Sequence, residues 1–390
     1  MDPKSGGPSH AIRELVRVQE QVGLEPTVLA TNAQSGLEWR DDTSYRESVM
    51  SEALCQKVPV QLASSLGRRR PWSRYSWSPA AARILNARLR SRQKPDIIHV
   101  HGVFSHITQT AARLAERYGV PYVVRPAGAL DFGCLKRGHA VLKRAYITAF
   151  LRRTLRSAAF VHVTSEKEQE PIHQQFPGVR TEIVPHGTEV LDASTGRFRD
   201  DLPAVAHSPF VLCLSRIHPI KRLDLAIRAF ASLVDDFADL RLVIAGNDAG
   251  ALSGLQQLAL EHCVDDRCVF TGFITGSAKA KAYSEARLFV HPSDHENFGL
   301  SVVEAMAYGC PVVTTTGVAS GLYVDKAGAG RVVGSDVEEI AGAMRELLNQ
   351  SRAMSGNRGA IFVEQNLTWS TVVHRLSRLY ESAIDQRQAC

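Results

Sequence analysis

The sequence predicts an α/β protein built from two Rossmann-like domains in tandem, and three observations lead to this prediction. The chain has 390 residues, which exceeds what one ordinary hydrophobic core accommodates. Short apolar runs alternate with helical patterns, as in parallel sheets covered by helices on both faces. A polar stretch with glycine, proline and paired acids, residues 191–208, interrupts the alternation, which then restarts.

The predicted elements follow the same order in each half. In the first half, helices are predicted at residues 9–22 and 108–118, and strands at 27–30, 96–100, 121–124, 160–164 and 183–185. In the second half, strands are predicted at 210–214, 240–245, 268–271, 288–291 and 311–314, and helices at 223–234, 255–262, 337–348 and 370–384.

These elements predict the domain bounds. We expect an N-terminal domain over residues 1–190, a linker over 191–208, a C-terminal domain over 209–369, and a final helix within 370–390 that packs back toward the N-terminal domain. Ligands of such sheets bind beyond the carboxyl ends of the strands. The expected site is therefore a cleft across which the two domains face each other.

Composition excludes several classes of protein. Hydrophobic residues make up 44% of the chain and charged residues 22%, which is typical of soluble globular proteins. No apolar run is long enough to cross a bilayer, and seven scattered cysteines without a C-x-x-C pair favour a reducing cytoplasm. The net charge of +6 favours an anionic partner. We expect no nucleic acid, because no recognisable binding module organises the basic residues.

Two candidates for a site lie in the first half. Gly6 and Gly7 open the first predicted helix, where small residues let backbone approach an anion; an ordinary loop with an N-cap explains them equally well. His101 leaves a predicted strand beside Gly102, a position that favours function. We expect His99 to point to the opposite face of the strand and to be structural.

In the second half, Arg216 and Lys221 follow the first predicted strand. Two cations on a loop at a strand's carboxyl end suit a diphosphate, although a solvated basic loop is an open alternative.

Two carboxylates, Glu296 and Glu304, lie eight residues apart around Gly299. On one helix they would be about 80° apart, so they would not share a face. We predict Glu296 on a loop and Glu304 inside the following helix, whose first N–H groups, from Phe298 to Leu300, form an anion site. The apolar neighbours of Glu304 disfavour the alternative of a solvated helix face.

The stretch from Glu296 to Glu304, taken with Arg216 and Lys221, closely resembles the retaining glycosyltransferases of family 4, which have the GT-B fold. The resemblance covers nearly the whole chain. It also includes Gly6-Gly7-Pro8-Ser9, His101-Gly102, Arg125-Pro126-Ala127-Gly128, Ile183-Val184-Pro185-His186-Gly187, Ala245-Gly246, Phe270-Thr271-Gly272, and Gly309-Cys310-Pro311. The two-glutamate motif with the basic loop is specific, whereas the glycine loops are not.

The resemblance implies a role for each matched residue. Arg216 and Lys221 would hold the donor diphosphate and stabilise its departing charge. Glu304 would bind the ribose, and Glu296 would orient the donor sugar together with the backbone of Phe298, Gly299 and Leu300. His101 would lie near the reacting sugar. The further donor contacts that the resemblance implies are Gly6, Gly7, Gly246, Phe270 and Phe273.

The resemblance also implies a metal-independent hexosyltransferase without a cofactor, which agrees with the lack of any Asp-x-Asp pair. Its partners would be a nucleotide-diphosphate sugar and a glycan or lipid-linked acceptor, as in polysaccharide and cell-envelope biosynthesis. Two rival functions stay open: a nucleotide-sugar epimerase of related fold, and an inactive sugar-nucleotide-binding subunit.

One departure from the family concerns the start of the chain. Family members have a central strand immediately before the glycine loop, whereas Met1-Asp2-Pro3 stands there in this sequence. We therefore expect the first strand of the N-terminal domain to be missing and the true start to lie upstream, which would leave the activity of this chain in question.

Peripheral contact with an anionic membrane is a further hypothesis. Residues 135–156 combine basic side chains with Val141, Tyr146 and Phe150, a pattern typical of a helix on anionic lipid. A solvated basic face over a core stripe fits equally well. A second candidate is Arg68-Arg69-Arg70 with Trp72, Tyr75 and Trp77. If either binds lipid, the protein would work at the inner face of the plasma membrane.

Overall fold

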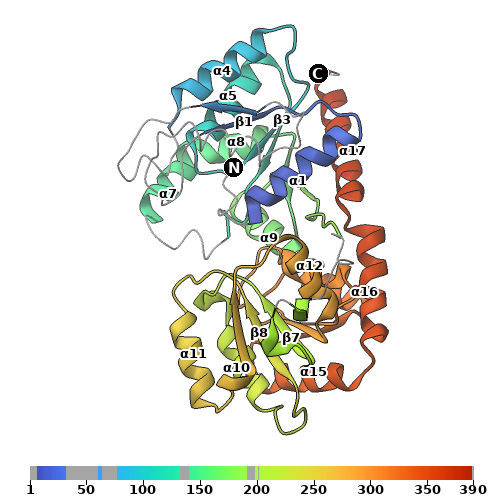
Figure 1. The fold of residues 1–390 in the computed structure, drawn as a ribbon. Helices are drawn as coiled ribbons and strands as arrows, with labels where there is room; N and C mark the ends of the chain where they lie inside the picture. Colours follow the sequence, from blue (N-terminus) through green and yellow to red (C-terminus); the bar gives the residue numbers. More distant parts are fainter. Residues whose placement is uncertain are drawn as a thin grey trace. The chain divides into compact units, whose positions relative to one another are not determined.

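The computed structural model describes residues 7–31, 60–63, 77–131, 140–190, 198–200 and 202–388. The chain divides into two compact units (Figure 1). Unit 1 comprises Met1–Gly187 and Trp369–Cys390, and unit 2 comprises Thr188–Thr368. The end of the chain thus returns to the unit in which it began.

Unit 2 contains one parallel sheet of six strands in the order β12-β11-β10-β7-β8-β9. Its strands are β7 (Phe210–Leu214), β8 (Arg241–Ala245), β9 (Cys268–Gly272), β10 (Leu288–His291), β11 (Val312–Thr315) and β12 (Gly330–Val333). The chain runs outward from β7 to β9, then crosses back to β10 on the other side of β7. The order therefore reverses between β7 and β10, which is where open parallel sheets bind ligands.

Helices cover both faces of this sheet. One core contains residues of α10 (Leu223–Ala231), α11 (Leu252–Glu261) and α15 (Val337–Asn349). The other contains residues of α12 (Gly276–Glu285), α13 (Leu300–Ala307), α14 (Gly321–Ala327) and α16 (Arg352–Asn366). Along β7, Val211 and Cys213 belong to the first core and Phe210 and Leu212 to the second, because successive strand residues point to opposite faces.

Part of the segment predicted as a linker packs onto unit 2. The short 3-10 helices Phe198–Asp200 and Pro203–Val205 bury Phe198 and Val205 in the second of these cores. Residues 191–197 and 201 lie outside the described residues.

Unit 1 contains a parallel sheet in the order β3-β4-β5-β6 and a separate parallel pair, β1-β2. The strands are β1 (Val28–Thr31), β2 (Val60–Ala63), β3 (Ile98–His101), β4 (Tyr122–Arg125), β5 (Phe160–Val163) and β6 (Thr181–Ile183). No strand among the described residues joins β1 to β3. Residues 1–6, which precede the first helix, lie outside the description.

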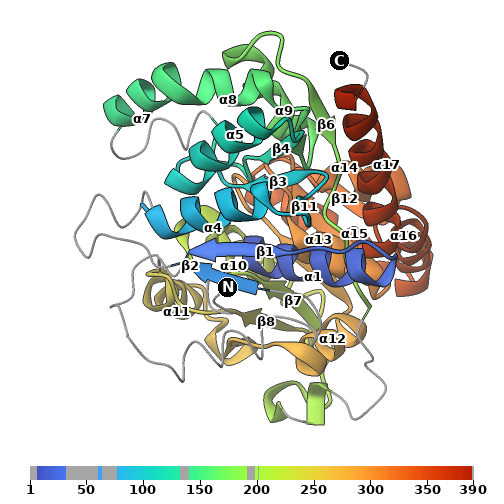
Figure 2. The same ribbon diagram turned by 90° about the horizontal axis from the view of Figure 1, so that it is seen from above.

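The C-terminal helix supplies one of the two layers on this sheet. α17 (Trp369–Gln388) lies beside α1 (Gly7–Gln21) in both ribbon views, and their apolar side chains share a core with Val123 and Phe160 (Figures 1 and 2). The opposite face is covered by α5 (His106–Tyr118), the π-helical turn η2 (Ile147–Leu151), α8 (Arg152–Ser157) and α9 (Glu166–Gln175). α4 (Pro79–Arg90) packs against α5, and α7 (Ala140–Tyr146) leads into η2.

Candidate functional site

Lys221 and Glu296 meet at the point where the strand order of unit 2 reverses. Lys221 ends the 3-10 turn Pro219–Lys221 after β7, and Glu296 lies on the loop after β10. The Lys221 ammonium donates a hydrogen bond to Glu296 Oε2, and only 8% of Lys221 is exposed. The two loops that flank the reversal are therefore joined by a largely buried ion pair.

The surrounding charges keep Glu296 ionised. Burial alone would raise the pKa of its carboxyl, but the charge of Lys221, with weaker contributions from His291 and Arg216, lowers this pKa below its usual value. Arg216 is exposed on the same loop as Lys221. These loops thus bring Arg216, Lys221 and the Glu296 carboxylate to the end of this sheet, a set suited to a phosphate group and a hydroxyl-rich ligand.

His291 was not predicted as a site residue, although it leaves its strand as His101 does. It is 2% exposed, and its Nε2 has no hydrogen-bond partner among the described residues. Burial lowers its pKa to about 4; the nearby Lys221 acts in the same direction and Glu296 opposes it. A neutral imidazole therefore lies close to the Lys221–Glu296 pair.

Glu304 lies inside α13, whereas Glu296 lies on the loop before it, as predicted. The two carboxylates therefore have different surroundings. The Glu304 carboxylate accepts hydrogen bonds from Lys279 Nζ at 2.7 Å and from the Tyr283 hydroxyl at 2.9 Å. Both partners come from α12 and are four residues apart, hence on one face of that helix. Lys279 and Tyr283 were not predicted as site residues, because no helix was predicted over this segment.

Gly299 starts α13 in a conformation that few other residues adopt. Its φ is +93°, and a Cβ here would lie 2.7 Å from Val318 Cγ1 and 2.8 Å from Ser320 Oγ. Phe298, immediately before it, is 4% exposed, and Leu300 is the first residue of the helix. This tight turn directs the first N–H groups of α13 toward the carboxyl end of the sheet, where an anion is favoured.

The remaining predicted donor contacts differ in exposure. Gly246 follows β8 with φ +152°, and its N–H donates to the Gly272 carbonyl at 2.8 Å. Phe270 packs against the first core of unit 2, whereas Phe273 is 60% exposed. Of these two aromatic residues, Phe273 is the more exposed and Phe270 is partly buried. Gly7 begins α1 in unit 1, and Gly6 lies outside the described residues.

His101 ends β3 in unit 1 and belongs to a histidine cluster in which His162 is buried and His99 and His101 are partly buried. The rings of His99 and His101 lie 4.3 Å apart, so our prediction that His99 points to the opposite face is wrong. Residues i and i+2 of a strand share a face. His99 Nδ1 lies 2.6 Å from the Tyr380 hydroxyl of α17, and its Nε2 lies 3.4 Å from His162 Nδ1.

Burial keeps this cluster uncharged. It lowers the pKa of His99, His101 and His162, and the neighbouring Arg125 guanidinium lowers each further. Arg125 itself is 3% exposed, and its Nη2 lies 2.8 Å from His186 Nε2. Arg125 and His186 both belong to motifs of the family resemblance, whereas no sequence pattern indicated Tyr380 or His162.

Acid is expected to destabilise unit 1 because His162 is buried without charge. Burial lowers its pKa to about 3, whereas a histidine in an unfolded chain titrates near ~6.5. Between these values only the unfolded chain binds the proton, so the stability is present above pH ~6.5 and is lost as the pH falls toward 3. Urea unfolding should show a loss of about 2 kcal/mol from this residue by pH 5. His162→Gln should flatten this pH dependence; an unchanged slope would contradict the assignment.

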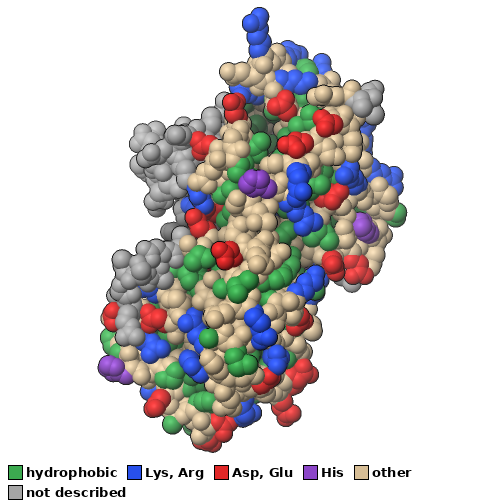
Figure 3. Space-filling view, turned by 90° about the vertical axis from the view of Figure 1, so that its right-hand side faces the viewer, with side chains coloured by type: hydrophobic (Ala, Val, Ile, Leu, Met, Phe, Trp, Pro, Cys, Tyr) green, Lys and Arg blue, Asp and Glu red, His purple; other side chains and the backbone are tan. Residues whose placement is uncertain are grey.

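Three further features of the described residues do not by themselves indicate a binding site. On the face shown in Figure 3, basic and acidic side chains are interspersed. No described helix is long and apolar enough to cross a membrane. In the described part of the chain, no group of three or more histidine, cysteine, aspartate or glutamate side chains is placed to hold a metal ion.

Sequence comparisons identify the family. Residues 6–187 match the glycosyl transferase 4-like domain, and residues 195–360 match glycosyl transferases group 1. A GDP-mannose-dependent alpha-(1-6)-phosphatidylinositol monomannoside mannosyltransferase of Mycolicibacterium smegmatis is 31% identical over 290 residues, which cover 68% of this chain and 74% of that protein. This chain belongs to the family 4 glycosyltransferases.

Other similarities support the family 4 glycosyltransferase assignment. A D-inositol 3-phosphate glycosyltransferase of Acidothermus cellulolyticus is 29% identical over 323 residues, covering 75% of this chain and 68% of that protein. The HepE protein of Anabaena, solved in complex with UDP and glucose, has a TM-score of 0.74 at 17% identity and covers 98% of both chains. The predicted α/β architecture and GT-B fold are thereby confirmed.

Two consequences follow for this family 4 glycosyltransferase. The prediction that the chain is a transferase acting on sugars is confirmed, and the comparisons give no support to an epimerase. The roles assigned to individual residues stay predictions. Lys221, Glu296, Gly299 and Glu304 are brought to one end of the unit 2 sheet, whereas His101 lies at the end of a strand of unit 1.

Proposed function

We propose that this glycosyltransferase moves a hexosyl group from a nucleotide-diphosphate sugar to a glycan or lipid-linked acceptor, with retention of anomeric configuration and without a metal ion. The observation that supports this most strongly is the Lys221–Glu296 ion pair at the strand-order reversal of unit 2. It combines a buried cation for a departing diphosphate with a carboxylate for a sugar hydroxyl.

In this proposal, the bond between the anomeric carbon and the diphosphate breaks while Arg216, Lys221 and the N-terminus of α13 stabilise the departing negative charge. Glu296 holds the donor sugar in place, and Glu304 accepts hydrogen bonds from the ribose hydroxyls. The acceptor hydroxyl attacks from the side that the diphosphate leaves, which preserves the configuration, and its proton passes to an oxygen of the departing diphosphate. His101 contributes from unit 1, near the reacting sugar.

The acceptor is proposed from the relatives together with the charge of the chain. Two relatives are named for an inositol phosphate and a phosphatidylinositol mannoside, both of which carry a phosphate. A chain with a net charge of +6 suits an acceptor of that kind. We place the reaction in polysaccharide or cell-envelope biosynthesis, in the cytoplasm or at the inner face of the plasma membrane.

Membrane contact would involve the basic segment that leads into α8. Its apolar residues Ile147, Leu151 and Leu155 are buried in the core, so they cannot form a lipid-binding stripe. Exposed Val141 and Phe150 remain on its surface, beside the basic residues. The second candidate segment lies outside the described residues except for Trp77, which is exposed.

The test is a ligand panel followed by a transfer assay. Uridine and guanosine diphosphates and their hexose conjugates are compared by thermal shift, since a specific ligand raises the melting temperature by mass action. The stabilising donor is then incubated with phosphate-bearing acceptors in the presence of a chelator, and NMR reports the anomeric configuration of the product. A donor that binds but never turns over would instead support the inactive binding subunit, and an inverted product would contradict retention.

Replacing Glu304 by Gln is expected to weaken donor binding more than it slows chemistry. The variant loses hydrogen bonds between a carboxylate and the ribose, which corresponds to about a 10- to 100-fold rise in KM. The value of kcat should stay within about threefold, because these contacts are equal in the ground state and the transition state. Steady-state kinetics with varied donor measure both constants. A fall in kcat at unchanged KM would contradict a binding role.

A further inference from the structure

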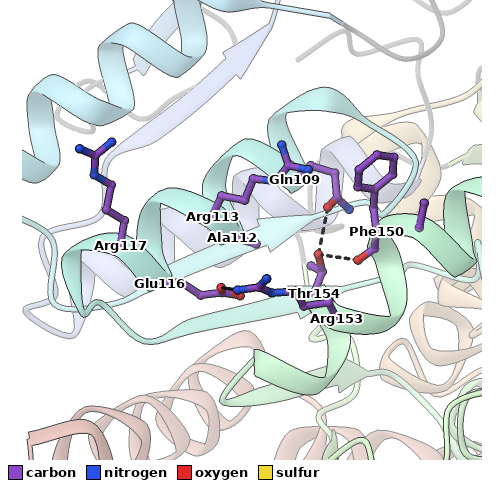
Figure 4. A pocket seen from close by; sticks show the side chains of 9 residues that line it. Gln109, Ala112, Arg113, Glu116, Arg117, Phe150, Arg153 and Thr154 are labelled. Atoms are coloured by element: carbon purple, nitrogen blue, oxygen red, sulfur yellow. Dashed lines mark hydrogen bonds and ion pairs between the residues drawn. The ribbon is translucent and has the colours of Figure 1, made fainter.

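Unit 1 contains a pocket that is formed by chain segments following the predicted site residue His101. It has a volume of about 610 Å³ and lies between α5 on one side and the η2–α8 segment on the other (Figure 4). Pockets that bind small molecules usually have volumes of about 300–1,000 Å³. None of the residues predicted to bind the donor lines it.

The lining of the pocket is strongly basic. Arg113 and Arg117 project from adjacent turns of α5, and Arg153 comes from α8 (Figure 4). The one carboxylate of the lining, Glu116, forms an ion pair with Arg153 at 2.8 Å. No ion pair of Arg113 or Arg117 occurs within the described ranges. The pocket therefore has two positive charges that its own carboxylate does not neutralise.

Phe150 fixes the orientation of one of these cations. The guanidinium carbon of Arg113 lies 5.3 Å from the centre of the Phe150 ring, and Phe150 is 41% exposed. A guanidinium held over a ring by this attraction keeps N–H groups that point away from the ring, and these can contact a phosphate. The same ring presents an apolar surface to whatever enters the pocket.

Polar side chains of α5 and α8 join the two sides of the pocket. The Thr154 hydroxyl donates to Gln109 Oε1 at 3.0 Å and also lies 3.2 Å from the Phe150 carbonyl, which belongs to the π-helical turn (Figure 4). Gln109 is only 5% exposed, and its Nε2 has no hydrogen-bond partner among the described residues. Isolated π-helical turns are frequent at functional sites.

We propose that this pocket binds the phosphate group of an organophosphate that also carries an apolar portion. Arg113, beside Phe150, holds the phosphate oxygens, Arg117 adds positive charge from the next turn of α5, and Phe150 contacts the apolar portion. The phosphate can belong to a lipid head group at a membrane surface or to a soluble phosphate ester. This inference concerns a binding site on unit 1 and does not rest on the proposed glycosyl transfer.

The test measures binding by the full-length chain, with monobutyl phosphate as the soluble probe and vesicles of phosphatidic acid in phosphatidylcholine as the lipid probe. The wild type should bind at least one of them, and Arg113→Gln combined with Arg117→Gln should weaken that binding at least tenfold. The matched control combines Arg228→Gln with Arg345→Gln in unit 2, which lowers the net charge equally and should retain binding. Thermal unfolding checks that all chains are folded.

The outcomes separate the two sources. Sedimentation with phosphatidic acid vesicles that depends on Arg113 and Arg117 supports a lipid head group. Binding of monobutyl phosphate alone, with the same dependence, supports a soluble ester. The proposal is overturned if neither probe binds, or if the control pair weakens binding as much as the pocket pair. Failure of glycosyl transfer with every donor would leave these binding results unaffected.

Discussion

Replacing Lys221 with Met is expected to lower kcat by about 10²- to 10³-fold, the usual effect of removing one group that stabilises charge in a transition state. Methionine keeps much of the volume of this nearly buried side chain but removes its positive charge. Steady-state kinetics with the identified donor measure the loss. A residual rate close to that of the wild type would refute the placement of the donor diphosphate at Lys221.

The ion pair makes stability a necessary control for this variant. Lys221→Met leaves the Glu296 carboxylate without its main counter-charge, and loss of one member of a buried pair costs about 3–5 kcal/mol; the 24% exposure of the Glu296 side chain reduces that cost. Adding Glu296→Gln removes the stranded charge. The double variant should regain stability but not activity, which separates the role in folding from the role in catalysis.

A control variant, Lys326→Met, completes this test. Lys326→Met removes an exposed lysine of unit 2 and should leave both kcat and stability near the wild-type values. If Lys326→Met slows the reaction as much as Lys221→Met does, the effect comes from net charge and the proposed site is wrong.

The sequence was sufficient to predict those parts of the site that depend on short-range order. Glu296 on a loop and Glu304 inside the next helix followed from their eight-residue separation and the intervening Gly299. The position of Arg216 and Lys221 at the end of a strand followed from an apolar run next to a basic loop. Both predictions use only spacing and local chemistry, and the structure agrees with both placements.

Contacts between distant segments could not be predicted in this way. The hydrogen bond between His99 and Tyr380 joins residues that are 281 positions apart in the sequence. It forms because α17 packs on the sheet of unit 1. Lys279 and Tyr283 were missed for a different reason. The helix that carries them is rich in alanine and polar residues, so its sequence lacks a clear apolar stripe.

Replacing Gly246 with Ala is expected to be among the most damaging single changes in unit 2. A Cβ at this position would lie 1.8 Å from the Ser215 carbonyl oxygen, and φ is +152°, which alanine strongly disfavours. Because a backbone atom is in the way, the strand ends must separate. We expect the free energy of unfolding to fall by at least about 3 kcal/mol.

Two other glycines make this result interpretable. Gly254→Ala in α11 meets no atom within 4 Å and should raise stability by about 1 kcal/mol, the usual gain in a helix. A Cβ at Gly330 would lie 1.8 Å from the Val312 carbonyl oxygen. Gly330 is the first residue of the edge strand β12, whereas the proposed site lies at the carboxyl ends of the central strands.

Urea unfolding and donor affinity together distinguish the roles of these positions. Gly246→Ala and Gly330→Ala should both lower stability. Only Gly246→Ala should also weaken donor binding in the fraction that remains folded, because Ser215 precedes Arg216 and the clash displaces that loop. Equal donor affinities for the two folded variants would mean that the carboxyl end of β8 takes no part in binding the donor.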